Sequence, residues 1–236
     1  MAIILTLETA TPVCSVALAV DGERIGFMES DAPNAHSKVL TLFIDEVLKQ
    51  GGIAPGQLDA VAVSRGPGSY TGLRIGVSAA KGLCYALDIP LLAPDTLQAM
   101  AWGALESFYR HDTPPADRLF CPMIDARRME VYCGIYDNKN QQVYEVDAKI
   151  ITPDTFSSLL QHHSIVFFGN GSEKCQPMYA DHPNALFIKG FHASAAFLIP
   201  LATTLYQNGK TENTAYFEPF YLKDFIAGKP NVKGLF

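Results

Sequence analysis

A glycine-rich segment between a short apolar run and a long helical pattern is the feature that most constrains this chain. It reads Ser64-Arg65-Gly66-Pro67-Gly68-Ser69-Tyr70-Thr71-Gly72-Leu73-Arg74. Residues 58–63 before it form a short, mostly apolar run, as in a covered strand, and residues 74–87 after it have helical spacing. Such an elbow directs backbone N–H groups and the positive end of a helix at one place, which suits an anion.

The glycine spacing leaves two interpretations of this elbow open. It is not a Walker A loop, because no Gly-Lys-Ser/Thr follows the correct glycine, and Gly66, Gly68 and Gly72 do not match the dinucleotide fingerprint. The first interpretation is a tight strand-to-helix turn that needs glycine torsions. The second is an anion-binding loop.

The rest of the chain alternates strand and helix patterns, which predicts an α/β fold with mixed sheets. In the first half we expect strands at 3–8, 14–20, 24–29, 58–63 and 89–92, and helices at 36–50, 72–87 and after Asp95. The second half repeats this layout weakly, with strands at 119–124, 130–136, 143–150 and 165–168, a helix starting at 152–154 and a long helix at 192–206.

The polar segment 110–118 indicates a boundary between two subdomains, 1–108 and 109–236. We expect the last ~20 residues to pack back on the first subdomain.

The composition of the chain favours a folded protein and argues against a free-standing nucleic-acid binder. The chain has 236 residues, 48% of them hydrophobic and 18% charged, which describes a folded protein. Its net charge of −6 argues against a free-standing nucleic-acid binder, so RNA would be reached through a partner. The start of the chain has no basic region before its short apolar run, and no segment approaches a membrane span. We expect a cytoplasmic protein that does not contact a membrane.

The cysteine pattern is also typical of a cytoplasmic protein. Cys14, Cys84, Cys121, Cys133 and Cys175 are odd in number, widely spaced and mostly in apolar surroundings. This pattern favours reduced thiols packed in a core over disulfides or a zinc site.

The segment Glu8-Thr9-Ala10-Thr11 is a second candidate site. An acidic residue at a strand end followed by hydroxyls is compatible with a phosphate-binding hairpin, in which the carboxylate positions a metal-bound water. The alternative is a capped, solvated turn. Together with the elbow it defines a candidate vestigial nucleotide or anion site: Glu8, Thr9, Thr11, Gly66, Gly68, Ser69 and Thr71.

Two further polar features have structural alternatives. A metal site on the helix that begins at His36 would need a second ligand three or four residues later, but Val39 and Leu40 stand there, so we expect a helix cap and no metal. The charged bend 125–130 holds Arg127 and Arg128, which would contact a phosphate or a partner carboxylate, or simply form a solvated hairpin tip.

A stripe of small side chains runs along the helix after the elbow. Gly72, Gly76, Ala80 and Cys84 fall four residues apart, so another helix can approach closely, and helices 36–50 and 72–87 carry few charges. These features predict a subunit interface, although burial inside one domain gives the same pattern. The interface residues that we expect are Val39, Leu40, Phe43, Gly72, Arg74, Gly76, Ala80 and Leu83.

Several of these segments, in this order, resemble the TsaB (YeaZ) family over nearly the whole chain. They are residues 4–10, 14–18, His36-Ser37, the block 65–76, residues 124–127 with 130–132, and Glu218-Pro219-Phe220-Tyr221-Leu222. The Gly-Pro-Gly-Ser-Tyr-Thr-Gly-Leu-Arg block is specific to this family and its TsaD relatives. One departure is Glu8, where the family usually has aspartate.

The resemblance implies an actin-like ATPase superfamily fold (ribonuclease H-like) of two related subdomains. It also implies a non-catalytic dimerisation subunit for making threonylcarbamoyladenosine in tRNA, with TsaD as partner, TsaE joining, and homodimers. TsaD relatives hold a metal with a His-x-x-x-His pair, which is broken here at Leu40. We therefore expect no cofactor on this chain, with ATP or ADP at the level of the complex. The alternative is a nucleotide-binding or ATP-hydrolysing enzyme, in which the Glu8 hairpin faces the elbow across a cleft.

Overall fold

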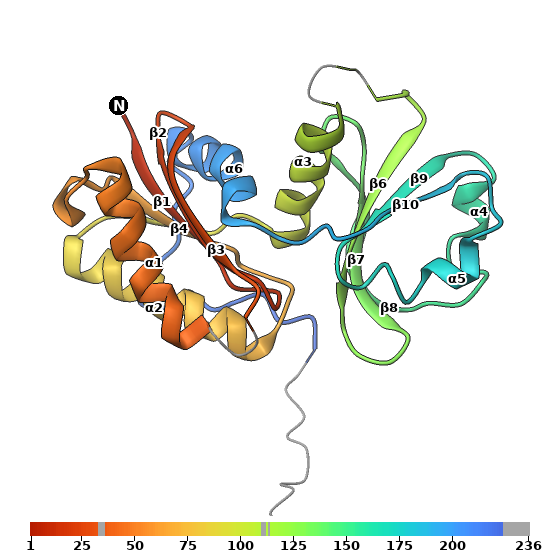
Figure 1. Cartoon of the computed structure of the whole chain (residues 1–236), viewed down its shortest axis with the longest axis horizontal. Helices are drawn as coiled ribbons and strands as arrows, with labels where there is room; N and C mark the ends of the chain where they lie inside the picture. Colours follow the sequence, from red (N-terminus) through yellow and green to blue (C-terminus); the bar gives the residue numbers. More distant parts are fainter. Residues whose placement is uncertain (33–35, 110–111, 113, 224–236) are drawn as a thin grey trace, which may run out of the picture.

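The computed structural model describes residues 1–32, 36–109, 112 and 114–223, and it has two lobes, each built on a five-stranded sheet (Figure 1). We call the lobe that contains β1–β5 lobe 1 and the lobe that contains β6–β10 lobe 2. The predicted boundary 110–118 lies partly outside the described residues, as does the end of the predicted subdomain 109–236.

Lobe 1 combines an antiparallel meander with two parallel strands. Its sheet has the order β3-β2-β1-β4-β5, in which β1 pairs antiparallel with β2 and parallel with β4. Its strands are β1 (Ile3–Glu8), β2 (Cys14–Val20), β3 (Glu23–Ser30), β4 (Ala60–Val63) and β5 (Leu91–Leu92). Its helices are α1 (His36–Gly51), the 3-10 turn η1 (Pro55–Gln57), α2 (Tyr70–Leu87) and α6 (Ala195–Gln207).

Lobe 2 repeats this topology. Its sheet has the order β10-β9-β6-β7-β8, so an antiparallel meander is again extended by two parallel strands. Its strands are β6 (Arg118–Asp125), β7 (Glu130–Tyr136), β8 (Gln142–Ile150), β9 (Ser164–Phe168) and β10 (Ala185–Ile188), and its helices are the single turns α4 (Ser157–Leu160) and α5 (Gln176–Tyr179). The predicted α/β fold of two related subdomains is confirmed.

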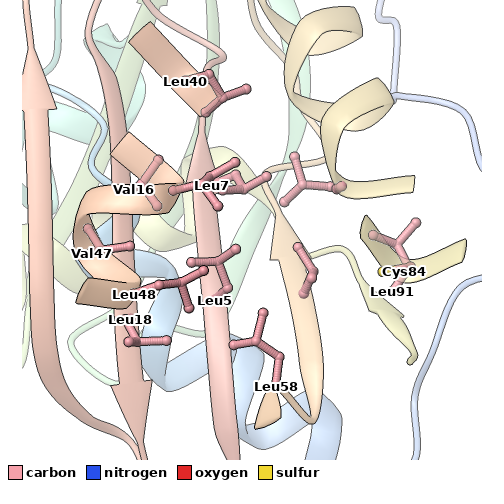
Figure 2. Packing of buried hydrophobic residues seen from close by; sticks show 14 of the residues in the cluster. Leu5, Leu7, Val16, Leu18, Leu40, Val47, Leu48, Leu58, Cys84 and Leu91 are labelled. Carbon is pink, nitrogen blue, oxygen red and sulfur yellow. The ribbon is translucent and has the colours of Figure 1, made fainter. Parts of the chain in front are cut away.

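The lobe 1 core lies between its sheet and the helix pair α1–α2. Every residue of β1 is buried, because both faces of this strand are covered, and Leu5 and Leu7 have no exposed surface. On α1 the buried positions Leu40, Ile44, Val47 and Leu48 follow the helical period and belong to the core cluster of the sheet. Figure 2 shows Leu40, Val47 and Leu48 facing the strands.

The opposite face of the lobe 1 sheet is covered by α6, which comes from the far end of the sequence. The Thr6 hydroxyl donates to the Ala195 carbonyl at 2.8 Å, and the Ala195 N–H donates to the Ser15 hydroxyl at 2.8 Å. The chain therefore returns to lobe 1 at Ala195, earlier than the last ~20 residues expected from the sequence. Helix α3 (Thr96–Tyr109) lies between the lobes and packs on both β6 and α6.

Most predicted elements are confirmed, and the differences are local. Helix α2 begins at Tyr70, before the predicted position 72, because Ser69 caps it. The helix expected after residue 152 is one turn long, and the long C-terminal helix begins at Ala195 instead of 192. The short elements α5 and β10 were not predicted.

Candidate functional site

The glycine elbow is held by hydrogen bonds to its own chain. The Gly66 N–H donates to the Thr96 hydroxyl at 3.1 Å, and the Ser69 N–H donates to the Ala10 carbonyl at 2.7 Å. The Ser69 hydroxyl accepts from the Gly72 N–H at 3.3 Å and caps α2. These N–H groups are therefore engaged in a tight turn. Residues 68–72, from the second half of the elbow into the first turn of α2, face open space.

The glycines of the elbow and of α2 allow the hairpin after β1 to lie directly on them. A Cβ on Gly68 would stand 2.4 Å from the Ala10 carbonyl oxygen, and one on Gly72 would stand 2.1 Å from the Thr9 carbonyl oxygen. A Cβ on Gly76 would stand 2.2 Å from the Thr9 hydroxyl. The Glu8 hairpin therefore does not face the elbow across a cleft, since the two segments are in contact. Residues 10–12 of the hairpin and residues 68–72 line one common cleft, which Glu8 does not reach.

The small-residue stripe faces the interior of its own lobe. Gly72, Gly76, Ala80 and Cys84 are all buried inside the chain, and so is Leu40. The prediction that Gly72, Gly76 and Ala80 offer surface to a partner is therefore wrong, and the physical reason is close packing on the Thr9 hairpin and the sheet. Leu40 is largely buried as well, but it lines a groove between α1 and α2. Of the other expected interface residues, Arg74 is exposed, while Val39, Phe43 and Leu83 are half-buried.

Glu8 lies inside lobe 1, next to the contact between the hairpin after β1 and the elbow, and it does not line the cleft between the lobes. Its Oε1 accepts from the Ala10 N–H at 2.7 Å and from the Ser64 hydroxyl at 2.8 Å, whereas Oε2 has no partner among the described residues. Burial raises the pKa of Glu8 to about 7, against the opposing effect of these hydrogen bonds. Its carboxyl group thus ties the β1 hairpin to the start of the elbow. Thr9 Oγ1 is likewise buried with no partner in the described part of the chain.

A cleft of about 850 Å³ separates the two lobes. Lobe 1 contributes Thr11, His36 and the first turn of α2, and lobe 2 contributes the β6–β7 bend and Asn170. The chain segment 220–223 closes one side. Of the candidate anion-site residues, Thr11, Gly68, Ser69 and Thr71 line this cleft, whereas Glu8, Thr9 and Gly66 are not among its lining residues.

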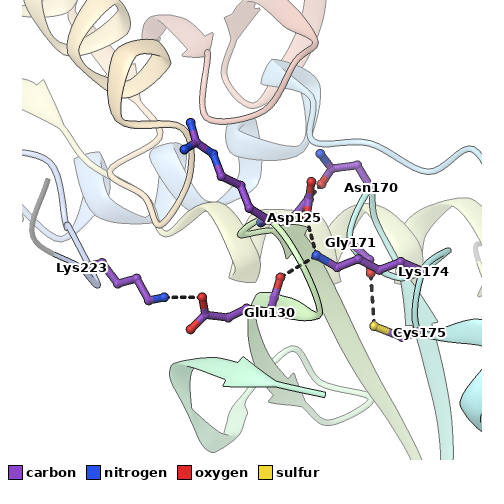
Figure 3. A network of polar contacts seen from close by, with 8 residues as sticks. Asp125, Glu130, Asn170, Gly171, Lys174, Cys175 and Lys223 are labelled. Atoms are coloured by element: carbon purple, nitrogen blue, oxygen red, sulfur yellow. Dashed lines mark hydrogen bonds and ion pairs between the residues drawn. The ribbon is translucent and has the colours of Figure 1, made fainter. Parts of the chain in front are cut away.

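The β6–β7 bend is braced by lysines from elsewhere in the chain. Lys174 pairs with the Asp125 carboxylate and donates to the Glu130 carbonyl at 2.6 Å, and Lys223 pairs with the Glu130 carboxylate (Figure 3). The Asp125 N–H donates to the Asn170 side-chain oxygen at 3.1 Å. Arg127 and Arg128 form the tip of this bend, and Arg127 lines the cleft.

The segment 212–223, which we call the strap, runs from lobe 1 across the elbow to lobe 2. The Phe220 N–H donates to the Arg65 carbonyl at 2.7 Å, and the Arg65 guanidinium lies 5.5 Å from the Phe220 ring centre. The Tyr221 ring packs on Tyr70 with 5.0 Å between ring centres. Spacing arguments did not identify the strap, and its only signal was the aromatic segment 218–222 of the family resemblance.

A shallower groove of about 500 Å³ lies between α1 and α2 on the surface of lobe 1. It is lined by Ser37, Leu40, Thr41, Tyr70, Thr71, Arg74, Ile75, Ser78 and Ala79. Ser37, Tyr70, Thr71 and Ile75 line both this groove and the cleft, so the two spaces share a wall.

Other candidate features have structural explanations. The His36 Nε2 lies 2.9 Å from the Thr11 carbonyl oxygen, so this ring joins α1 to the β1 hairpin. Among the described residues no group of three or more His, Cys, Asp or Glu side chains is placed to hold a metal ion. All five cysteines are free and buried, as the sequence predicts. No helix in the described part of the chain is long and apolar enough to cross a membrane.

Comparison with known proteins identifies the relatives of this chain. Residues 19–227 match the family described as "TsaD: tRNA N6-adenosine threonylcarbamoyltransferase". The chain is 30% identical to the tRNA threonylcarbamoyladenosine biosynthesis protein TsaB of Haemophilus influenzae, over 96% of this chain and 95% of the relative. It is 32% identical to TsaB of Bacillus subtilis, over 90% of this chain and 89% of the relative.

Solved structures agree with the fold. YeaZ from Pseudomonas aeruginosa is 26% identical with a TM-score of 0.74, covering 94% of this chain and all of that one. The activator of 2-hydroxyisocaproyl-CoA dehydratase from Clostridium difficile, solved with bound ADPNP, has a TM-score of 0.52 at 10% identity and covers 88% of this chain and 96% of that one. That likeness concerns the fold alone, which is the actin-like ATPase fold. The matched lengths and the shared two-lobed topology lead to one conclusion: this chain belongs to the TsaB (YeaZ) family of tRNA threonylcarbamoyladenosine biosynthesis proteins.

Proposed function

We propose that this chain is a non-catalytic scaffold of a tRNA threonylcarbamoyltransferase complex and works in the cytoplasm. In this proposal a TsaD-type enzyme is its principal partner, a TsaE-type protein joins the complex, and a second copy competes for the same surface. The chain reaches tRNA through the complex, and any ATP or ADP acts at the level of the complex. Its membership of the TsaB family and its similarity to the TsaD family support this proposal.

The observation that carries the interface is the groove between α1 and α2. Thr41, Arg74 and Ser78 line it and are exposed, and Ile75 and Ala79 give it a half-buried apolar floor. Leu42, on the same surface helix α1, is 65% exposed. An apolar centre with a polar rim is the usual composition of a protein interface. This groove replaces the buried stripe of α2 as the proposed contact surface.

The scaffold proposal is tested with a matched pair of substitutions. Thr41→Arg places a long cation in the groove, whereas Thr204→Arg makes the same change at an exposed position of α6 on the other face of the lobe 1 sheet. We expect Thr41→Arg to reduce co-elution with a TsaD-type partner at least tenfold, because desolvating an unpaired cation at an interface is costly. Thr204→Arg is expected to co-elute normally. Equal co-elution of both variants would remove the groove from the interface.

A nucleotide-hydrolysing enzyme is the alternative, and the cleft between the lobes is the feature that favours it. The start of α2 and the Thr11 hydroxyl line this cleft. The location of Glu8 weighs against it, because a carboxyl group bound to Ala10 and Ser64 inside lobe 1 is not placed to orient a metal-bound water in the cleft. Calorimetry with ATP, ADP and magnesium on the isolated chain decides between them, since the scaffold proposal predicts no heat of binding.

A further inference from the structure

Two consecutive arginines at the β6–β7 bend have an unusual backbone conformation. Arg127 has a φ of 72° and Arg128 a φ of 48°, in the left-handed region that non-glycine residues seldom occupy. Both residues are exposed. Such strained positions persist where the surrounding structure holds them, and they concentrate at functional sites. The bend therefore holds two long cations outward at a structural cost.

Neither arginine side chain is used within the described fold. No hydrogen bond, ion pair or ring contact joins either guanidinium to another described residue. The two nearest acidic groups along the bend are already neutralised, since Asp125 pairs with Lys174 and Glu130 pairs with Lys223 (Figure 3). The tip is thus locally cationic on a chain whose net charge is −6.

The cleft next to this tip has the other groups that a nucleotide chain requires. Arg127 lines the cleft, and so do the aromatic side chains Tyr70, Tyr132, Phe220 and Tyr221. Thr11 also lines it, is only 3% exposed, and its hydroxyl has no hydrogen-bond partner among the described residues. A buried hydroxyl without a partner is a group that a ligand would satisfy.

We propose that the Arg127–Arg128 tip and the adjacent cleft bind single-stranded RNA, and specifically an unpaired segment of tRNA. The guanidinium groups contact phosphates, and an unstacked base enters the cleft beside its aromatic side chains. Cationic side chains interleaved with aromatic rings are the common pattern for single-stranded nucleic acids. An acidic protein segment would need the arginines but would leave the aromatic cleft and the Thr11 hydroxyl unused.

This inference rests on the proposed function, because an acidic chain with one small cationic tip needs a partner to hold the RNA. The shared wall between the cleft and the α1–α2 groove brings the two surfaces together, since Tyr70 and Thr71 line both. RNA bound in the cleft would therefore lie beside the partner that docks in the groove. The tip contributes local contacts to a larger RNA-binding surface.

The test uses substitutions that suit the backbone of the bend. The double variant Arg127→Gly/Arg128→Gly removes both cations, and glycine accepts a positive φ without strain, so the fold is retained. A matched control, Lys139→Ala/Lys210→Ala, removes two exposed cations, one of them at the opposite end of β7. Binding of transcribed tRNA and of its isolated anticodon stem–loop to the chain with its TsaD-type partner is measured by fluorescence anisotropy over a salt series.

We expect the glycine variant to lose at least tenfold in affinity for both RNAs and to reduce the slope of log affinity against log salt by about 1 to 2, as the loss of one or two phosphate contacts requires. The control and Arg127→Lys/Arg128→Lys are expected to retain the slope. Equal affinities and slopes for the glycine variant and the unmodified chain would overturn the proposal.

Two other outcomes would also overturn it. Loss of TsaD-type partner binding by the glycine variant without RNA would identify an acidic protein surface as the target. Loss of ATP binding with tRNA binding unchanged would identify a small-nucleotide site. Co-elution is measured separately, so failure of the scaffold proposal is recognised by itself, and RNA binding is then measured on the chain alone at low ionic strength.

Discussion

Glu8 is a carboxyl group that the fold keeps fully away from water. Burial raises its pKa from 4.5 to about 7, so the folded chain holds this proton to a higher pH than the unfolded chain does. The free energy of unfolding therefore falls as the pH rises from about 4.5 to about 7, by at most roughly 3 kcal/mol, and is level above that range.

Glu8→Gln removes this titration and keeps an oxygen acceptor for Ala10 and Ser64. We expect the variant to lose that part of the pH dependence and to be at least as stable as the original chain at pH 8. Urea unfolding between pH 5 and pH 8.5 measures the effect. Glu145→Gln, on the exposed part of β8, is the control and should keep the original pH profile. A Glu8→Gln profile that matches the original would show that Glu8 does not titrate in this range.

At the scale of residues, the sequence indicates which segments are structurally special, but not which groups their side chains contact. The Glu8 hairpin was expected to face the elbow across a cleft, but the glycines bring the two segments into direct contact, and Glu8 does not line the cleft. The periodicity of α2 indicates a stripe of small side chains and does not indicate what covers it, because a neighbouring helix and the Thr9 hairpin require the same small residues. Only three-dimensional contacts distinguish these cases.

Helix α2 contains glycines in opposite environments, which makes it a direct test of this packing. We expect Gly76→Ala to destabilise the chain by about 2–4 kcal/mol, because its methyl group would meet the buried Thr9 side chain. We expect Gly82→Ala to stabilise it by about 0.5–1 kcal/mol, since open space surrounds that position and alanine favours helix. Urea unfolding of both variants measures the difference, and similar values for the two would contradict the packing described here.

At the scale of elements, the spacing of hydrophobic residues predicts helices and strands reliably where one face of the element is buried. The predicted bounds of β1 and β7 agree with the structure to the residue. Apolar side chains run through β1, and each of the two strands ends at or next to a charged residue. The single-turn helices α4 and α5 and the four-residue strand β10 carry too few residues for a period to appear. The position of α6 on lobe 1 depends on contacts between residues 189 positions apart, which no local pattern contains.

The whole molecule protects its thiols, since all five cysteines are free and buried, two of them in lobe 1 and three in lobe 2. Burial raises the pKa of Cys14 to about 12 and those of Cys84 and Cys175 to about 11, which disfavours the reactive thiolates. We expect no rapid reaction with Ellman's reagent in the native chain and reaction of all five thiols in urea. Rapid labelling of any thiol in the native chain would show that its lobe opens.

The path of the chain through the two lobes also sets an order for its synthesis. Lobe 2 is inserted between α3 and α6, so the ribosome makes β1–β5 first and delivers α6, which covers their second face, after the whole of lobe 2. The hydrogen bonds of Thr6 and Ser15 to the backbone of Ala195 form only after that interval, although the Thr6 hydroxyl also has the Ala17 carbonyl of β2 as an acceptor at 3.3 Å. All strands and helices of lobe 2 lie within residues 118–188, so lobe 2 can complete its fold before α6 is made. The sheet of lobe 1 is made first but receives the helix that covers its second face last.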